Sequence, residues 1–117
     1  MPTTLLGMTE LLHLALPAEW DAAVAAGTYE RSTRGRSLAE VGFIHTSLPH
    51  QLRGTADAFY ADLDELVLLR IDPARVGAEI KVEDGFPHIY GALPVEAVRE
   101  AVPVRRDAAG LLPLPVD

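Results

Sequence analysis

Three histidines stand in strand-like stretches of the sequence, where each imidazole interrupts a run of apolar residues. His13 lies in LLHLAL, His45 in GFIHTS and His88 in FPHIYG. Imidazole titrates near neutral pH, so it can act as a general acid or base, contact a ligand or bind a metal. In an extended strand His88 and Tyr90 share one face, with Ile89 on the other. Spacing alone does not bring distant strands together, but from these shared features we infer that the three histidines and Tyr90 converge on one concave site.

Other residues near these stretches are candidates for contacts with a ligand. Ser47 shares the expected face of His45, and Gln51 follows in a predicted helix, from which it could reach a bound ligand. Tyr29 comes directly after a helix stop and could form one wall of the site, although an aromatic residue there is also typical of a core. Glu83 is the carboxylate nearest in sequence to the His88 strand, but it precedes an Asp-Gly turn, where side chains are usually exposed.

The charge of the chain limits the class of partner. The net charge is −7 and the isoelectric point is near 4.9, so the protein repels polyanions and the sequence argues against nucleic acid as a partner. A local exception is YERSTRGRS, which brings together Arg31, Arg34 and Arg36 beside Gly35. This stretch is either a solvated surface loop or a site for one or two phosphates of a small ligand.

The order of the predicted elements indicates the fold class. Helices are predicted over 17–27 and 48–61, the second with Ser47 as its N-cap, and a short helical turn over 37–42. Strands are predicted over 11–16, 43–47, 64–72, 78–83, 86–91 and 101–106, followed by an irregular proline-containing tail. This order is not a regular βαβ alternation, so we predict an α+β domain with largely antiparallel strands. No Gly-rich phosphate loop of the Rossmann or Walker type is present.

Length and composition place these elements in one domain, 1–117. The 117 residues leave no room for a second core, and no stretch approaches the roughly 20 apolar residues of a membrane span. The N-terminus has no basic region before its apolar part, so it does not read as a secretory signal, and we expect a cytoplasmic protein. With no cysteine, the chain has neither disulfides nor thiolate ligands.

The motifs in their order along the chain resemble the bacterial and plant family called domain of unknown function 952. The resemblance covers about residues 11–98, and its two strongest pieces are GFIHTS and FPHIYG. That family is similar in fold to the ADP-ribosyltransferases, in which two small, mostly antiparallel sheets enclose a cleft for NAD. The resemblance therefore implies an ADP-ribosyltransferase-like fold with two or three helices, and NAD as substrate or ligand.

The resemblance also implies roles for single residues. His13 stands on the strand whose His or Arg contacts a ribose hydroxyl of NAD, and His45 stands where a residue touches the nicotinamide side, with Ser47 beside it. The third motif of protein-modifying transferases is usually a glutamate, but here that strand carries His88 and Tyr90. A carboxylate stabilises the oxocarbenium-like transition state far better than a neutral imidazole does, so the missing glutamate puts catalysis in question.

Three hypotheses about function follow. The first is an enzyme that transfers or hydrolyses an ADP-ribosyl or related nucleotide group on a small molecule or other acceptor, with His45 and His88 as catalytic residues. The ligand contacts would then come from His13, Ser47, Gln51, Tyr90 and Tyr29. The second is a module that binds NAD, ADP-ribose or another nucleotide without chemistry. The third is a hydrolase with a metal held by the three histidines, although no compact His-x-x-x-His spacing supports it.

Overall fold

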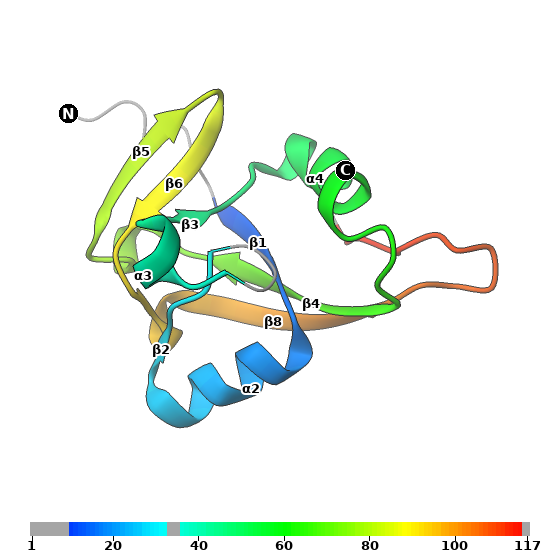
Figure 1. Ribbon diagram of the computed structural model, residues 1–117, viewed down its shortest axis with the longest axis horizontal. Helices are drawn as coiled ribbons and strands as arrows, with labels where there is room; N and C mark the ends of the chain where they lie inside the picture. The colour runs from blue at the N-terminus through cyan, green and yellow to red at the C-terminus, as the bar shows by residue number, and fades with distance from the viewer. Residues whose placement is uncertain (1–9, 33–35, 116–117) are drawn as a thin grey trace.

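Three small antiparallel sheets and three α-helices make up the part of the chain described by the computed structural model, residues 10–32 and 36–115 (Figure 1). The first sheet has the order β1-β4-β8, formed by Leu11–Ala15, Glu65–Ile71 and Val98–Arg105. The second has the order β3-β6-β5, formed by Ile44–His45, Phe86–Tyr90 and Glu79–Glu83. The third pairs β2, Thr28–Tyr29, with β7, Leu93–Pro94.

The predicted α+β class with antiparallel strands is confirmed, but the expected number of sheets was wrong. The described residues form three sheets where two were expected. The additional sheet is the pair of β2 and β7, which contain two residues each. Strands this short show no recognisable alternation of apolar and polar residues in the sequence. The strand expected over 43–47 is also shorter, since β3 contains only Ile44 and His45.

Local signals in the sequence account for two of the helices. Helix α2, Pro17–Ala26, begins at a proline and ends at Gly27, whose φ of 94° lies in the left-handed region that glycine adopts without strain. Helix α3, Leu38–Val41, begins with a capping box in which Ser37 and Glu40 bond each other's backbone N–H. Both helices lie where the sequence predicts them.

The helix predicted over 48–61 differs from the one observed. A 3-10 turn, Pro49–Gln51, precedes α4, which covers Leu52–Phe59. Ser47 is not an N-cap, because its hydroxyl lies 2.9 Å from Thr55 Oγ1, and the Leu48 N–H donates instead to Gln51 Oε1 at 2.9 Å. The Gln51 side chain thus takes the capping role that the sequence assigns to Ser47.

Both faces of the β1-β4-β8 sheet are buried along β1 and most of β4. Along β4, Val67, Leu69 and Ile71 belong to one apolar cluster, and Leu66 and Leu68 to a second on the opposite face. Burial on both faces explains why the strand reads as a continuous apolar run without polar alternation. The first cluster includes the core residues of the β3-β6-β5 sheet, and the second those of α4 and the C-terminal tail. This central sheet therefore positions the other elements on its two sides.

The β5-β6 hairpin projects beside β3 (Figure 1). Its turn residues Asp84 and Gly85 both have positive φ, 54° and 83°, which is the signature of a two-residue type I′ turn. At the turn, Gln51 Nε2 donates to the Gly85 carbonyl at 2.7 Å. Pro87 has no N–H with which to continue the ladder to β3, although its carbonyl accepts from Thr46 N and Oγ1. The short β3 follows from this proline.

The tail after β8 is irregular, as predicted, and two arginines hold it. The Arg106 guanidinium donates to the carbonyl groups of Tyr60, Leu63 and Gly110, and Arg53 Nη1 donates to the Leu112 carbonyl at 2.7 Å. Across the described ranges, no helix is long and apolar enough to cross a membrane.

Candidate functional site

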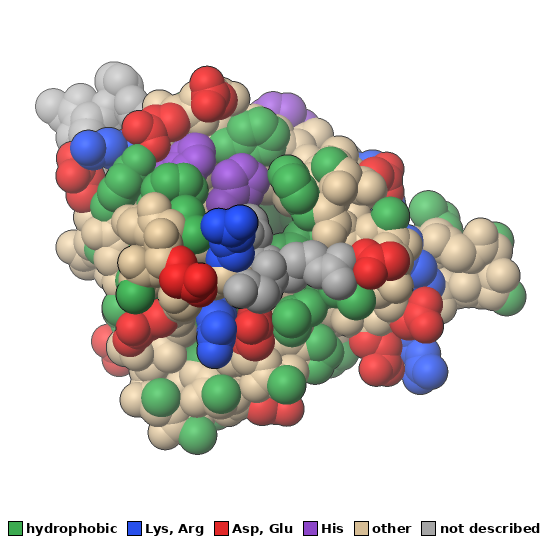
Figure 2. Space-filling model, in the orientation of Figure 1, with side chains coloured by type: hydrophobic (Ala, Val, Ile, Leu, Met, Phe, Trp, Pro, Cys, Tyr) green, Lys and Arg blue, Asp and Glu red, His purple; other side chains and the backbone are tan. Residues whose placement is uncertain are grey.

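Five ring side chains lie side by side on one face of the β3-β6-β5 sheet, and we call them the imidazole row. They alternate along two adjacent strand segments with residues that face the core, such as Ile44 and Ile89, which are fully buried. Figure 2 shows histidine side chains on this face among hydrophobic ones, with lysine or arginine side chains next to them. The members of the row are Phe43, His45, Phe86, His88 and Tyr90.

His88 lies at the centre of the row, in contact with rings on both sides. Its ring centroid is 4.7 Å from that of Phe43 and 5.3 Å from that of His45, both edge-to-face. His45 also lies 5.1 Å from Phe86, and Phe43 lies 5.6 Å from Tyr90. The strand register explains the closeness of the two imidazoles, because His45 and His88 are direct partners across β3 and β6.

The two histidines of the row differ in their hydrogen bonds. His88 Nδ1 lies 2.7 Å from the Phe86 carbonyl, which can only accept, so Nδ1 carries the proton and Nε2 of a neutral ring keeps its lone pair. Neither ring nitrogen of His45 has a partner among the described residues. Partial burial, with a smaller contribution from the charge of His88, lowers the pKa of His45. His45 is therefore a neutral imidazole at pH 7, able to accept a proton.

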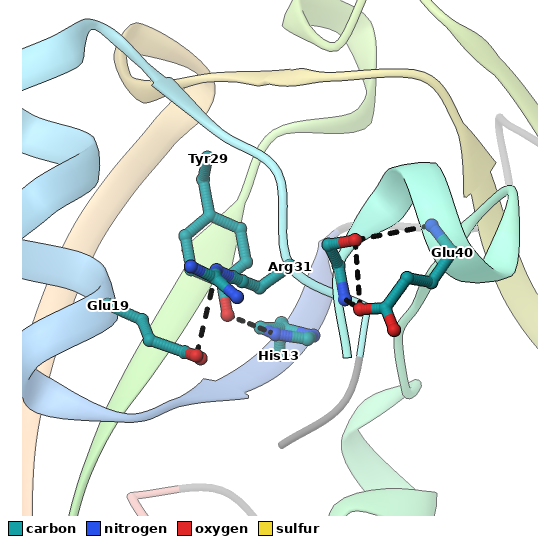
Figure 3. A network of polar contacts seen from close by, with 6 residues as sticks. His13, Glu19, Tyr29, Arg31 and Glu40 are labelled. Carbon is teal, nitrogen blue, oxygen red and sulfur yellow. Dashed lines mark hydrogen bonds and ion pairs between the residues drawn. The ribbon is translucent and has the colours of Figure 1, made fainter. Parts of the chain in front are cut away.

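His13 lies behind the row and is fully engaged within the protein. Its Nδ1 donates to the His45 carbonyl at 2.7 Å, and its Nε2 accepts from the Tyr29 hydroxyl at 2.8 Å (Figure 3 shows the contact with Tyr29). The ring is buried, and desolvation lowers its pKa to about 4. One imidazole thus joins β1, β3 and β2, which belong to three different sheets. Both nitrogens expected to bind a ligand are occupied by protein groups.

This geometry predicts a loss of stability in mild acid. The unfolded chain takes up a proton at His13 near pH 6.5, whereas the folded chain resists it down to about pH 4. Between these values the unfolded state binds more protons, so stability rises with pH and is lost as the pH falls through the window. A shift of this size corresponds to roughly 3 kcal/mol. Urea denaturation at several pH values measures it.

The control is His13→Gln, since an amide can donate to the His45 carbonyl and accept from Tyr29 without titrating. Subtracting the pH dependence of the variant's free energy of unfolding from that of the wild type gives the contribution of His13. Equal slopes in the two proteins between pH 4 and 6.5 would contradict the prediction.

The remaining predicted ligand contacts lie at different distances from the row. Tyr90 belongs to it. Ser47 is buried against Thr55, and the Gln51 amide bridges Leu48 and Gly85. Tyr29 is buried behind His13 as part of the core, and does not form a wall of the row.

A small cavity of about 10 Å³ lies beside His45, between β1, β3 and α4. His13, His45, Ser47 and Phe59 are among its lining residues. This volume is about that needed for one water molecule, and far below the roughly 300 to 1,000 Å³ of a small-molecule pocket. The cavity is therefore too small to hold a nucleotide.

Three charged residues of β5 border the row on the same face. Their direct partners across the hairpin are row residues: Glu79 pairs with Tyr90, Lys81 with His88 and Glu83 with Phe86. The Tyr90 hydroxyl donates to Glu83, and the Lys81 ammonium lies 4.9 Å from the centre of the Tyr90 ring. The bond to Glu83 raises the pKa of Tyr90. Glu83 Oε1 also lies 4.0 Å from His88 Nδ1.

The arginine stretch is described only in part. Arg31 pairs with Glu19 at 3.6 Å and lies close to Tyr29 and His13 (Figure 3). A backbone bridge between Arg31 and Ser37 closes the loop, while Arg34 and Gly35 lie outside the described residues. Within the described ranges, no three His, Asp or Glu side chains are placed to hold a metal, so a three-histidine site does not form.

Sequence reasoning missed the two phenylalanines of the row. Phe43 and Phe86 are two residues from His45 and His88, so strand alternation already places each on the histidine face. The signal was present, but an aromatic residue in a strand is read first as core.

Comparisons with known proteins extend this picture. Residues 14–101 match the family described as protein of unknown function (DUF952). The crystal structure of protein CC0527 from Caulobacter crescentus is similar, with 33% identity, a TM-score of 0.78, and coverage of 91% of this chain and 95% of that one. The solution structure of CC0527 gives 35% identity, a TM-score of 0.73, and coverage of 91% and 92%. The comparison with curated proteins gives no match.

Proposed function

This chain belongs to the DUF952 family, and we propose that it binds a nucleotide of the NAD type over the imidazole row and transfers or hydrolyses its ADP-ribosyl group. The supporting observation is the row itself: five adjoining rings, two of them imidazoles, on one face of a sheet. Flat rings offer stacking surfaces to a nicotinamide or adenine, and base–aromatic stacking contributes about 1 to 3 kcal/mol per base. The proposal includes an ADP-ribosyltransferase-like arrangement of the small antiparallel sheets.

The free imidazole nitrogens supply hydrogen-bonding groups beside this stacking surface. His45 offers two ring nitrogens without described partners, and His88 offers Nε2. A ribose hydroxyl or a nicotinamide amide has the donors and acceptors to match them. His13 contributes indirectly, because its bond to the His45 carbonyl fixes the backbone of β3.

The proposed reaction breaks the bond between the ribose C1′ and the nicotinamide nitrogen, and the electron pair leaves with nicotinamide. A water or acceptor hydroxyl then forms the new bond to C1′, and its proton passes to the neutral His45 ring. Glu83 is the carboxylate nearest to the row in the described chain, and could stabilise the positive charge that develops at C1′. It lies on β5, next to the strand where the family resemblance leads one to expect a glutamate.

A second candidate, binding without chemistry, is favoured by one contact. Glu83 already accepts a hydrogen bond from Tyr90, and its side chain is about half exposed, so it is not held against a reacting centre. A site of this kind would recognise NAD or ADP-ribose through the row and leave it intact.

One experiment separates the two. Purified protein is mixed with NAD, ADP-ribose or a nucleotide, and both the melting temperature and nicotinamide release are followed. We expect NAD to raise the melting temperature, because ligand at 100 times its dissociation constant adds roughly 2.7 kcal/mol of stability. Release of nicotinamide identifies the enzyme, and a shift without release identifies the binding module.

The matched variant is His45→Phe, which keeps a ring between Phe86 and His88 but removes both nitrogens. We expect this variant to retain at least part of the thermal shift and to lose turnover. If no nucleotide produces a shift or release in the wild type, the proposed function is wrong.

A further inference from the structure

Four strands end the two larger sheets. A backbone bridge from Leu12 of β1 to Ser47, just after β3, joins two of these edges, and β8 and β5 form the other two. Just after β8, the Arg106 N–H donates to the Asp64 carbonyl, so these two residues form a hydrogen-bonded pair. Hydrogen-bonded and non-hydrogen-bonded pairs then alternate from there along β4 and β8. Pro103 and Val67 form a non-hydrogen-bonded pair in this alternation, so the backbone nitrogen of Pro103 points away from β4. Proline has no N–H, so a donor is missing from the outer edge of β8.

The outer edge of β5 keeps its donors. Glu83 and Phe86 flank the two-residue turn, so they form a hydrogen-bonded pair. Ile80 and Val82 then fall at non-bonded pairs with β6 and direct their N–H and C=O groups outward. No described residue bonds to these groups. The outward-pointing backbone groups of Ile80 and Val82 are two residues apart, which is the spacing at which an added strand can form hydrogen bonds with them.

The side chains of β5 define the chemistry of that strand. On the row face stand Glu79, Lys81 and Glu83, with side-chain exposures of 67%, 48% and 47%. On the other face stand Ile80, half-buried, and Val82, 45% exposed. A complementary strand has cationic residues opposite the two glutamates and aliphatic residues opposite Ile80 and Val82. The net charge of −7 also attracts a basic partner.

We infer that β5 binds an extended basic peptide segment by strand addition, with alternating cationic and aliphatic side chains. The inference does not depend on nucleotide binding at the row. A second copy of the chain fits less well, because two β5 strands in full antiparallel register would place Glu79 against Glu83 and Lys81 against Lys81. Like charges directly opposite each other destabilise a strand pair.

The test uses a synthetic capped peptide containing Lys-Val-Ser-Val-Lys, whose pattern reads the same in both strand directions. In an NMR titration of the full chain, we expect the largest amide shifts at Ile80 and Val82. A matched Glu-Val-Ser-Val-Glu peptide should bind at least about tenfold more weakly, because it places carboxylates against Glu79 and Glu83. These two arms use the wild-type protein only.

Val82→Pro then tests the backbone contact. The N–H of Val82 points outward, so proline removes a donor from the edge while every β5-β6 bond remains, and it tolerates the extended Lys81 before it. We expect at least about tenfold weaker binding, whereas Val82→Ala, which keeps the N–H, should bind within about threefold of the wild type.

Three results would each overturn the inference. They are the absence of amide shifts at Ile80 and Val82 with the basic peptide, equal binding of the basic and acidic peptides, and a concentration-dependent dimer in analytical ultracentrifugation that Val82→Pro abolishes. The last result would assign the edge to a second copy of the chain.

Discussion

Replacement of His13 by alanine is expected to lower the free energy of unfolding by about 3 to 5 kcal/mol, a large fraction of the roughly 5 to 15 kcal/mol that stabilises a typical domain. The substitution leaves the buried Tyr29 hydroxyl and the His45 carbonyl without partners, each at a cost of about 1 to 3 kcal/mol, and opens a cavity. Chemical denaturation monitored by circular dichroism measures the change.

Tyr29→Phe is the matched control for this result. It removes one of the two hydrogen bonds of His13 and keeps the ring that packs in the core, so we expect a loss of only about 1 to 2 kcal/mol. A His13→Ala protein as stable as the wild type would show that the imidazole does not hold the three sheets together.

Ile44→Ala is expected to destabilise the protein by about 2 to 5 kcal/mol, because the side chain is fully buried in the first apolar cluster. The neighbouring His45→Ala should cost less than about 1 kcal/mol, since that ring lies on the half-exposed face, and should abolish any turnover. Thermal melts of the two variants, with nicotinamide release for the second, provide the measurement.

The comparison also has a clear negative outcome. If His45→Ala lowers the melting temperature as much as Ile44→Ala does and leaves ligand binding unchanged, His45 is a structural residue. The proposed chemistry at the row would then have no base.

Strand alternation is the part of the site that the sequence predicts well. The FPHIYG stretch places His88 and Tyr90 on one face and Ile89 on the other, and the structure has Ile89 in the core and both rings in the row. Alternation with a period of two residues is a local property of a strand, so it does not depend on which other strands it pairs with. The α+β class rests on local patterns of the same kind, whereas the family resemblance rests on motifs and their order along the chain.

Partners that are distant in sequence were not predictable in the same way. The bond of Ser47 with Thr55 and the two bonds of His13 depend on which strands meet, and no local pattern encodes this. His13 has the same pattern as His45, a polar residue in an apolar strand, yet one is buried and bonded and the other half-exposed. The difference arises because both faces of the central sheet are covered at His13, whereas the row face is only partly covered, so that His45 stays half-buried while His88 beside it is buried.

The pairing of the strands has a consequence for how the chain folds during synthesis. Each of β1, β2 and β3 lies within the first 45 residues, and its partner is respectively β4, β7 or β6, all beginning at Glu65 or later. A nascent chain therefore has none of these pairings until β4 has left the ribosome, and such non-local closure slows folding. The contact between His45 and His88 forms later still, so a chain arrested before Phe86 contains no imidazole row.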